Sequence, residues 1–182
     1  GKISFRAQGA AELWDPITGE ITALNVERQS EYVSIALDMP KAGSCFVVFN
    51  HNKKQQKVEK VALANTQSID NKWTVQFPEG WGAPAELEVE TLAPWCELPM
   101  SEEGQAFSGS ATYTTTFNWS NESKEVVLDL GKVSMIAEVF VNDQKVRTLW
   151  CTPYAADITS YLKPGENKLQ VKVVSTWFNR LA

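Results

Sequence analysis

The sequence predicts an all-β fold, an antiparallel β-sandwich or jelly roll preceded by a small antiparallel β-segment. Three observations support this prediction. Apolar and polar residues alternate with a period of two along many short segments, as in strands with one buried face. Gly, Pro, Asn and Asp separate these segments at turn positions. No stretch of ~10 residues has the periodicity of an amphipathic helix.

Length and composition indicate the domain organisation. The 182 residues are 43% hydrophobic and 21% charged, which is typical of a globular protein. This length accommodates one large β-sandwich or a small module followed by a larger one. We predict the second arrangement, with residues 1–66 as a short antiparallel β-region and residues 67–182 as the sandwich. The first region would be the end of a preceding β-domain or a linker module.

The termini and hydropathy of the chain indicate its context. It contains no run of ~18 apolar residues and no N-terminal signal sequence, so a membrane partner is not expected. Its first residues, 2–6, already have the pattern of a strand. We therefore expect the chain to be a piece excised from a longer polypeptide.

In the first region, residues 33–37 alternate and are followed by the apolar run 45–49. These two segments are expected to form a hairpin. Upstream, strand-forming residues flank a turn at 15–19, where Pro16 restricts φ and Gly19 allows positive φ. The strands of this region are expected to be too few to bury a core alone.

In the second region, segments 73–77 and 86–90 flank a turn. Leu87 and Val89 point one way while three glutamates point the other, so one face of this strand is expected to be exposed. In segment 111–117, a row of threonines alternates with a more apolar row. Such a β-branched polar row suits an exposed or ligand-facing surface of a sheet.

Later segments complete the predicted sandwich. Segments 126–130 and 137–141 each have an apolar inner row, and the pair Asn142-Asp143 suits a two-residue turn with left-handed φ. Another turn, at 163–167, precedes the last alternating segment, 169–173. About seven strands after residue 70, joined by turns, predict an antiparallel sandwich or jelly roll.

Charge argues against a nucleic-acid partner. The net charge is −5 and the pI is near 5.0, whereas phosphate backbones require a clustered basic surface. Four lysines form a local basic run, which is expected to be a solvated loop because it is interleaved with Gln and Glu. They are Lys53, Lys54, Lys57 and Lys60.

The cysteines and the one histidine, His51, lack the spacing of a zinc site. Small buried thiols are the expected state, with one disulfide as the alternative, for Cys45, Cys96 and Cys151. No cofactor is predicted. The sequence leaves open a single structural Ca²⁺ held by backbone carbonyls and one or two carboxylates.

No catalytic residue is predicted. Glycoside hydrolysis requires two carboxylates flanking one bond, and the 22 acidic residues include no pair that the sequence singles out. A Ser-His-Asp or Cys-His arrangement would have to use His51, which lies in a lysine-flanked loop. A glycine-rich phosphate loop between a strand and a helix is also missing.

Seven tryptophans are the distinctive feature of the composition. Trp rings stack on the C–H faces of sugars while amides, carboxylates and guanidiniums bond the hydroxyls, so exposed Trp beside Asn, Asp or Arg suits carbohydrate binding. Trp14 and Trp73 lie within strand patterns and are expected in the core. Trp81 and Trp95 lie in turn or loop contexts, where core and ligand-facing positions are equally compatible with the sequence.

The order of the motifs in the second half resembles a known family. The sequence is similar to the galactose-binding-like sugar-binding domain of family 2 glycoside hydrolases, and more narrowly to the C-terminal β-sandwich of family 106 α-L-rhamnosidases. Segment 12–19 also resembles the region just upstream in that family. Asp143 departs from the family pattern, which usually has Gly there, and Asp tolerates left-handed φ. The resemblance rests on segments 107–117, 128–133, 137–142, 149–150, 153–154, 157–159, 162–167 and 177–181.

The resemblance implies a non-catalytic accessory domain of a larger, α-L-rhamnosidase-like enzyme whose catalytic carboxylates lie in a separate domain. The implied partners are that catalytic domain and, as ligands, plant or other glycans, and the parent enzyme is expected to be secreted or periplasmic. Candidate ligand-binding residues are Trp81, Trp95, Trp150, Tyr154, Asn179 and Arg180. Asp157 is expected to cap backbone N–H groups in the corner loop 149–158.

Two alternatives remain at the level of sequence. In the first, the domain is purely structural, and Trp150, Tyr154 and Asp157 only hold loops in place while an apolar patch docks on the missing domain. In the second, which the residues favour less, the chain is an independent hydrolase or lyase.

Overall fold

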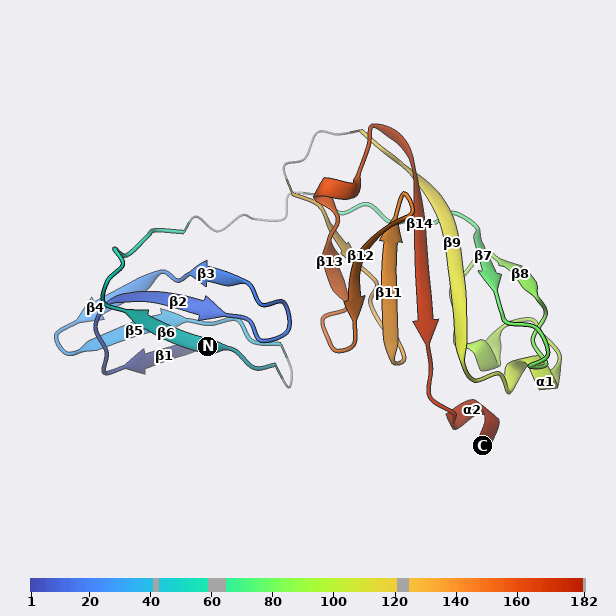
Figure 1. Ribbon diagram of the computed structural model, residues 1–182, viewed down its shortest axis with the longest axis horizontal. Coiled ribbons are helices and arrows are strands. Elements are labelled where there is room, and N and C mark those ends of the chain that lie inside the picture. The colour runs from blue at the N-terminus through green and yellow to red at the C-terminus, as the bar shows by residue number, and fades with distance from the viewer. Residues whose placement is uncertain (41–42, 59–64, 121–124, 182) are drawn as a thin grey trace. The chain divides into compact units, whose positions relative to one another are not determined.

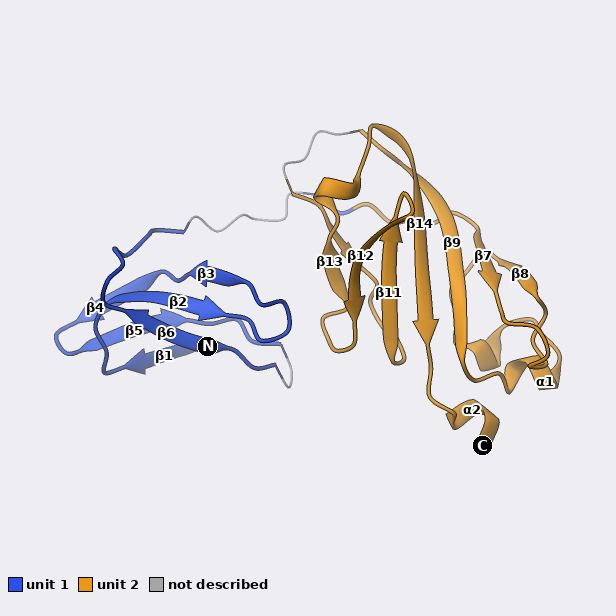
Figure 2. Ribbon diagram, in the orientation of Figure 1, with its two compact units in different colours: residues 1–66 blue, residues 67–182 orange. Residues whose placement is uncertain are grey.

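A computed structural model describes residues 1–40, 43–58, 65–120 and 125–181 (Figure 1). The chain divides into two compact units, Gly1–Thr66 and Gln67–Ala182, called here unit 1 and unit 2 (Figure 2). The helical segments of these residues are short: α1 (Glu102–Gln105), α2 (Phe178–Leu181) and the 3-10 turns η1 (Trp95–Glu97) and η2 (Thr159–Tyr161). The remaining elements are strands with antiparallel pairing, which confirms the predicted all-β class.

Unit 1 consists of two three-stranded antiparallel sheets, with the strand orders β1-β5-β4 and β3-β2-β6. The strands are β1 (Lys2–Phe5), β2 (Ala10–Trp14), β3 (Ile21–Ala23), β4 (Val26–Gln29), β5 (Tyr32–Ala36) and β6 (Phe46–Asn50). The turn between β2 and β3 forms as predicted. Asp15 Oδ1 accepts hydrogen bonds from the backbone N–H of Ile17 at 2.7 Å and of Thr18 at 3.2 Å, and Gly19 has a φ of 73°.

The predicted hairpin between segments 33–37 and 45–49 is wrong. β5 pairs with β1 and β4, whereas β6 pairs with β2 in the other sheet. The physical reason is that both segments are apolar on one face, and placing them in different sheets lets these faces pack against each other.

Unit 1 also buries a small core of its own, contrary to the expectation that its strands are too few. The buried residues Ala11, Val33, Ile35 and Leu37 form this core, and seven partly buried residues, including Phe5, Val47 and Phe49, pack against it.

Unit 2 is built on a six-stranded antiparallel sheet in the order β12-β11-β14-β9-β7-β8, whose strands lie side by side in Figure 1. Its strands are β7 (Trp73–Gln76), β8 (Glu86–Val89), β9 (Ser110–Trp119), β11 (Ile136–Val141), β12 (Gln144–Leu149) and β14 (Gly165–Val174). A two-stranded sheet, β10 (Val127–Asp129) with β13 (Ala155–Asp157), contributes Leu128 to the same core.

The alternation read from the sequence matches the burial in unit 2. Ala137, Val139 and Val141 on β11 are fully buried, while Glu86 and Glu88 on β8 are exposed. The threonines at 112, 114 and 116 lie on the more exposed side of β9. One face of the sheet therefore packs in the core and the other faces solvent.

The β11–β12 turn forms at Asn142 and Asp143, whose φ angles are 51° and 64°. Lys168 Nζ lies 2.8 Å from Asp143 Oδ1. The left-handed turn therefore forms with Asp at the position where the resembling family usually has Gly, as predicted.

The expected burial of the cysteines is wrong. All three thiols are free, but Cys96 is exposed and Cys45 and Cys151 are only half-buried. Cys96 lies in η1, where Trp95 is the side chain directed into the core. Of the helices in the described ranges, none has the length and apolar character needed to cross a membrane.

Candidate functional site

Two exposed tryptophans and an arginine meet near the C-terminus of unit 2. Trp81 lies in the turn between β7 and β8, and Trp177 lies between β14 and α2. Their ring centroids are 5.8 Å apart and the rings are inclined by 62°. The guanidinium carbon of Arg180 lies 5.6 Å from the Trp81 ring centroid, within the range of a cation–π contact. We call Trp81, Trp177 and Arg180 the aromatic platform.

The C-terminal half of the platform is fastened to the segment before β9. Ser175 N donates to the carbonyl oxygen of Gly109 at 2.8 Å, and Arg180 N donates to Ser108 Oγ at 3.2 Å. Asn179 Nδ2 donates to the carbonyl oxygen of Phe107 at 3.3 Å. The predicted candidate Asn179 therefore helps to position the turn that carries Trp177 and Arg180.

The Trp81 half of the platform depends on a close approach of two backbones. Gly82 has a φ of 88°, and a Cβ atom there would lie 2.9 Å from the carbonyl oxygen of Glu103 in α1. Only glycine fits this position, because a side chain would meet both the backbone of α1 and an unfavourable φ. The turn between β7 and β8, which carries Trp81, is thus held against α1.

The platform leaves an aromatic surface and a cation available to a ligand. Trp81 is 39% exposed and Trp177 is 57% exposed. Within the described ranges, the Arg180 guanidinium makes no hydrogen bond or ion pair to another side chain or to a carbonyl group. Its five N–H donors can therefore bond the hydroxyl or carboxylate oxygens of a ligand that stacks on the rings.

The other predicted binding residues lie elsewhere. Trp95 is buried, and its indole N–H donates to the Tyr113 hydroxyl at 2.6 Å. Burial raises the pKa of Tyr113 above its ordinary value. Tyr154 is also buried, with its hydroxyl donating to the carbonyl oxygen of Met135 at 2.7 Å. Trp150 is exposed at the start of the corner loop, with no ring contact to the platform.

Asp157 bonds the backbone in the corner loop. Its Oδ1 accepts hydrogen bonds from Thr159 N at 2.8 Å and Thr159 Oγ1 at 2.6 Å. The loop carries the chain from β12 in the large sheet to β13 in the small one. Asp157 thus has contacts of the kind expected for a loop-fixing residue rather than for a catalytic carboxylate.

Trp177 was missed as a candidate, although it belongs to the terminal motif 177–181. Its position after the last alternating strand could have identified Trp177 as a candidate binding residue. The sequence could not show that the Trp81 turn and the terminal turn, almost a hundred residues apart, come into contact.

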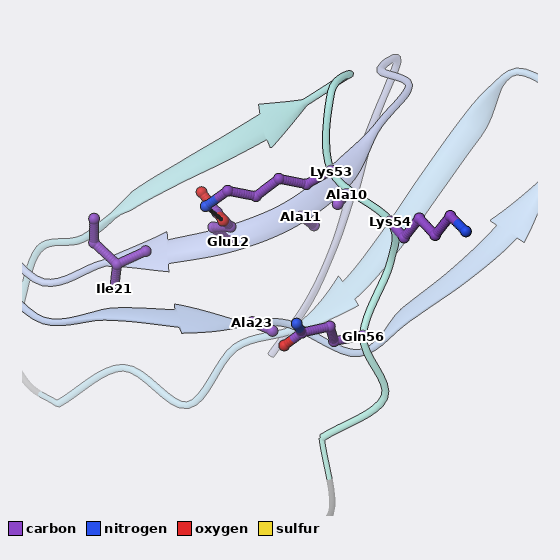
Figure 3. Close-up of a pocket in the computed structure, with 8 residues that line it drawn as sticks. All are labelled: Ala10, Ala11, Glu12, Ile21, Ala23, Lys53, Lys54 and Gln56. Atoms are coloured by element: carbon purple, nitrogen blue, oxygen red, sulfur yellow. Dashed lines mark hydrogen bonds and ion pairs between the residues drawn. The ribbon is translucent and has the colours of Figure 1, made fainter.

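Unit 1 contains a cavity of about 500 Å³, lined by Ala10, Ala11, Glu12, Ile21, Ala23, Lys53, Lys54 and Gln56 (Figure 3). Lys53 Nζ lies 2.5 Å from Glu12 Oε1, and the Trp14 indole N–H donates to Glu12 Oε2 at 3.3 Å.

Trp14 was expected in the core and is exposed instead, whereas Trp73 is buried as predicted. In the basic run, Lys60 lies outside the described residues.

The hydrogen bonds from Lys53 and Trp14 hold the pKa of Glu12 below its ordinary value of 4.5. A lowered pKa in the folded state means that the ionised carboxylate stabilises the protein above pH 4.5, and that this contribution is lost as the pH falls through the folded-state pKa. Glu12→Gln should therefore be less stable than the wild type near pH 7. The difference should shrink as the pH falls below about 4.5.

Urea unfolding of the wild type and of Glu12→Gln at several pH values checks this prediction. The NMR methyl signals of Val33 and Ile35, in the core of unit 1, follow the unfolding of this unit. Glu88→Gln, at an exposed position of β8, is the control and should leave the pH dependence of unit 1 unchanged. A stability difference between wild type and Glu12→Gln that stays constant down to pH 3 would contradict it.

The described residues contain no group of three or more His, Cys, Asp or Glu side chains that could hold a metal ion.

Comparison with known proteins shows what the chain is similar to. Residues 100–182 match the family model described as glycosyl hydrolase 2 galactose-binding domain-like. The chain is 40% identical over 113 residues to a protein of Formosa agariphila named as a candidate beta-glucuronidase, covering 60% of this chain and 10% of that protein.

Two solved structures share the fold. A rhamnosidase from Novosphingobium sp. PP1Y matches 98% of this chain and 17% of its own, with 31% identity and a TM-score of 0.87. A β-glucuronidase from Ruminococcus gnavus, in complex with a C6-substituted uronic isofagomine, matches 60% of this chain and 21% of its own, with 25% identity and a TM-score of 0.52. The chain thus spans a small fraction of each relative.

These matches confirm the resemblance drawn from the motifs of the second half. They agree with the all-β sandwich of unit 2 and with the similarity to rhamnosidases. Residues 100–182 are thus similar to the galactose-binding-like domain found in glycoside hydrolases.

Proposed function

We propose that unit 2 is a non-catalytic accessory domain of a larger, rhamnosidase-like glycoside hydrolase and that it binds glycan through the aromatic platform. The observation that supports this most directly is the contact of two exposed tryptophans with an arginine whose guanidinium is available to a ligand. The Trp rings would stack on a sugar face, and Arg180 would bond its hydroxyl or ring oxygens. The catalytic carboxylates of the parent enzyme would lie in another domain.

A docking role on the catalytic domain is the second candidate. Phe178 and Leu181 of α2 are exposed apolar residues beside the platform. A contiguous exposed apolar patch is typical of an interaction surface, and these two side chains would contribute to one. In this role the domain would pack on the rest of the enzyme without a ligand of its own.

Trp177→Ala should lower the affinity for an oligosaccharide ligand at least tenfold, because about 1.4 kcal/mol of stacking energy corresponds to a factor of ten. Each of the seven tryptophans has one indole N–H group, and an NMR titration of the whole chain with rhamnose-containing pectin oligosaccharides follows these groups. The signals of Trp81 and Trp177 should shift together, with a dissociation constant in the millimolar range.

Trp150→Ala is the matched control, since Trp150 is exposed to nearly the same extent as Trp177 but lies outside the platform. It should leave both the affinity and the melting temperature nearly unchanged. If Trp81 and Trp177 do not respond to any of the oligosaccharides, the docking role is the better account. Turnover of a chromogenic rhamnoside or an acetyl ester by the purified chain would contradict the non-catalytic role.

A further inference from the structure

We propose that unit 1 carries a separate binding site for a neutral, hydroxyl-rich ligand such as a sugar ring. The site comprises the cavity around Glu12 and Lys53 together with an exposed apolar row, Phe46, Trp14 and Ile21. It lies on the sheet formed by β3, β2 and β6, and it does not depend on the aromatic platform of unit 2.

Strand register places the apolar row on one face. Trp14 is paired with Ile21 of β3 and with Phe46 of β6. Directly paired residues on antiparallel strands lie on the same face of a sheet. Their exposed fractions are 41%, 53% and 61% for Trp14, Ile21 and Phe46. The neighbouring residues Ala11 and Leu13 point to the opposite face, into the core of unit 1.

The cavity adjoins this row on the same face. Glu12 lies two residues before Trp14 and therefore points the same way. Ile21 belongs both to the row and to the cavity lining. Ala10 and Ala23 lie on the same face as Glu12, and their small side chains leave an open depression of about 500 Å³ beside it.

Glu12 supplies a fixed polar group to this cavity. Its side chain is 9% exposed and is held by Lys53 on one oxygen and by the Trp14 indole on the other. Figure 3 shows the Lys53 ammonium meeting the Glu12 carboxylate, while Lys54 points away from it. Each carboxylate oxygen can accept a second hydrogen bond, and the ammonium has further N–H donors.

The paired charges select the class of ligand. An anion would meet the Glu12 carboxylate, and a cation would meet the Lys53 ammonium. A polyol satisfies both groups, because one hydroxyl can donate to the carboxylate while its neighbour accepts from the ammonium. The indole of Trp14 can then cover the C–H face of the same ring.

The ion pair by itself fastens the loop after β6 to the sheet. The Lys53 side chain is 57% exposed and the Glu12 side chain 9% exposed, so the ammonium keeps N–H donors open to solvent while the carboxylate is held at the sheet. A fixed carboxylate and an accessible ammonium beside an exposed tryptophan are suited to bonding the hydroxyls of a ring that stacks on the indole.

The test is an NMR titration of the whole chain with D-glucose, D-galactose, L-rhamnose and D-glucuronic acid. The neutral sugars should shift the indole signal of Trp14 and the methyl signals of Ala10 and Ala23. Lys53→Met and Trp14→Ala should each weaken this binding at least tenfold. Lys54→Met, which alters a lining residue that points away from Glu12, should change it less than twofold. Glucuronic acid, which differs from glucose by a carboxylate at C6, should bind more weakly than glucose.

The methyl signals of Val33 and Ile35 in the core show whether unit 1 remains folded in each variant. If Lys53→Met disturbs them, Phe46→Ala, at an exposed position of the same row, takes its place. The proposal is overturned if none of the neutral sugars shifts the signals of Trp14, Ala10 and Ala23, or if glucuronic acid binds more tightly than glucose. It is also overturned if Lys54→Met weakens sugar binding as much as Lys53→Met does. The signals of Trp81 and Trp177 report on unit 2 in the same experiment. Sugar binding in unit 1 and glycan binding at the platform of unit 2 are therefore tested independently.

Discussion

Phe107→Ala should lower the free energy of unfolding of unit 2 by about 4 kcal/mol, because truncating a buried aromatic residue removes its burial energy and leaves a cavity. Phe107 has no exposed surface. Its ring packs edge-on against Phe77 at a centroid distance of 5.1 Å, and it is tilted by 60° against Trp95 at 4.9 Å. Denaturant unfolding monitored by tryptophan fluorescence measures the loss.

The exposed Phe178 provides the matched control for this substitution. Phe178→Ala removes the same atoms from a largely exposed position and should change the free energy of unfolding by no more than about 0.5 kcal/mol. Equal effects of the two substitutions would contradict the assignment of Phe107 to the centre of the core.

Phe107→Ala also has a consequence for the platform. The carbonyl oxygen of Phe107 accepts the hydrogen bond from Asn179, and Ser108 accepts the one from Arg180. Movement of this segment would therefore displace the turn that carries Trp177. We expect any glycan affinity of the platform to fall in Phe107→Ala as well, although Phe107 itself would not touch the ligand.

Asn167→Ala should destabilise unit 2 by about 3 kcal/mol, because several buried groups would lose their partners at once. Asn167 is fully buried at the start of β14. Its Nδ2 donates to the carbonyl oxygens of Lys163 at 2.8 Å and Gly165 at 2.9 Å. Its Oδ1 accepts from Lys163 N at 2.9 Å and from Asn142 Nδ2 at 2.8 Å.

This network joins two turns of the sheet. Asn142 Oδ1 in turn accepts from Lys168 N at 3.1 Å, so the β11–β12 turn is bonded to the turn before β14. Asn118→Ala, on the exposed side of β9, is the control and should have a small effect on unfolding measured by the same assay. A loss below about 1 kcal/mol for Asn167→Ala would show that water replaces the network in the variant.

Local pattern was sufficient to predict most strands of unit 2. The period of two in segments 73–77, 111–117 and 137–141 follows from the geometry of a strand with one buried face, so it appears in the sequence wherever such a strand forms. The turns at 15–19 and 142–143 were predictable for a similar reason, since few residue types adopt their backbone angles.

Pairing between strands was less predictable. Segments 33–37 and 45–49 have strand patterns, but the pattern does not specify the partner. The same sequence is compatible with a hairpin or with a crossing between two sheets. Burial of both apolar faces in one core decides between them, and this is a property of unit 1 as a whole.

The sequence predicted which residue types form the candidate site, but not which individual residues belong to it. Trp81 and Arg180 were selected because they combine aromatic surface with hydrogen-bond donors, and the structure brings them into contact. Trp95 and Tyr154 have the same chemistry but are buried, and the loop context alone could not distinguish them. Trp14 shows the reverse case, since it lies within a strand pattern but faces outward.

The sequence by itself determined the all-β class, the positions of most strands and turns, and the resemblance to galactose-binding-like domains, because these depend on residues close together in the chain. Only the tertiary structure decided which aromatic residues are exposed and which of them meet. The contacts Trp81–Trp177 and Glu12–Lys53 join residues far apart in sequence. Such contacts are set by how sheets, turns and loops pack, and no local pattern specifies that packing.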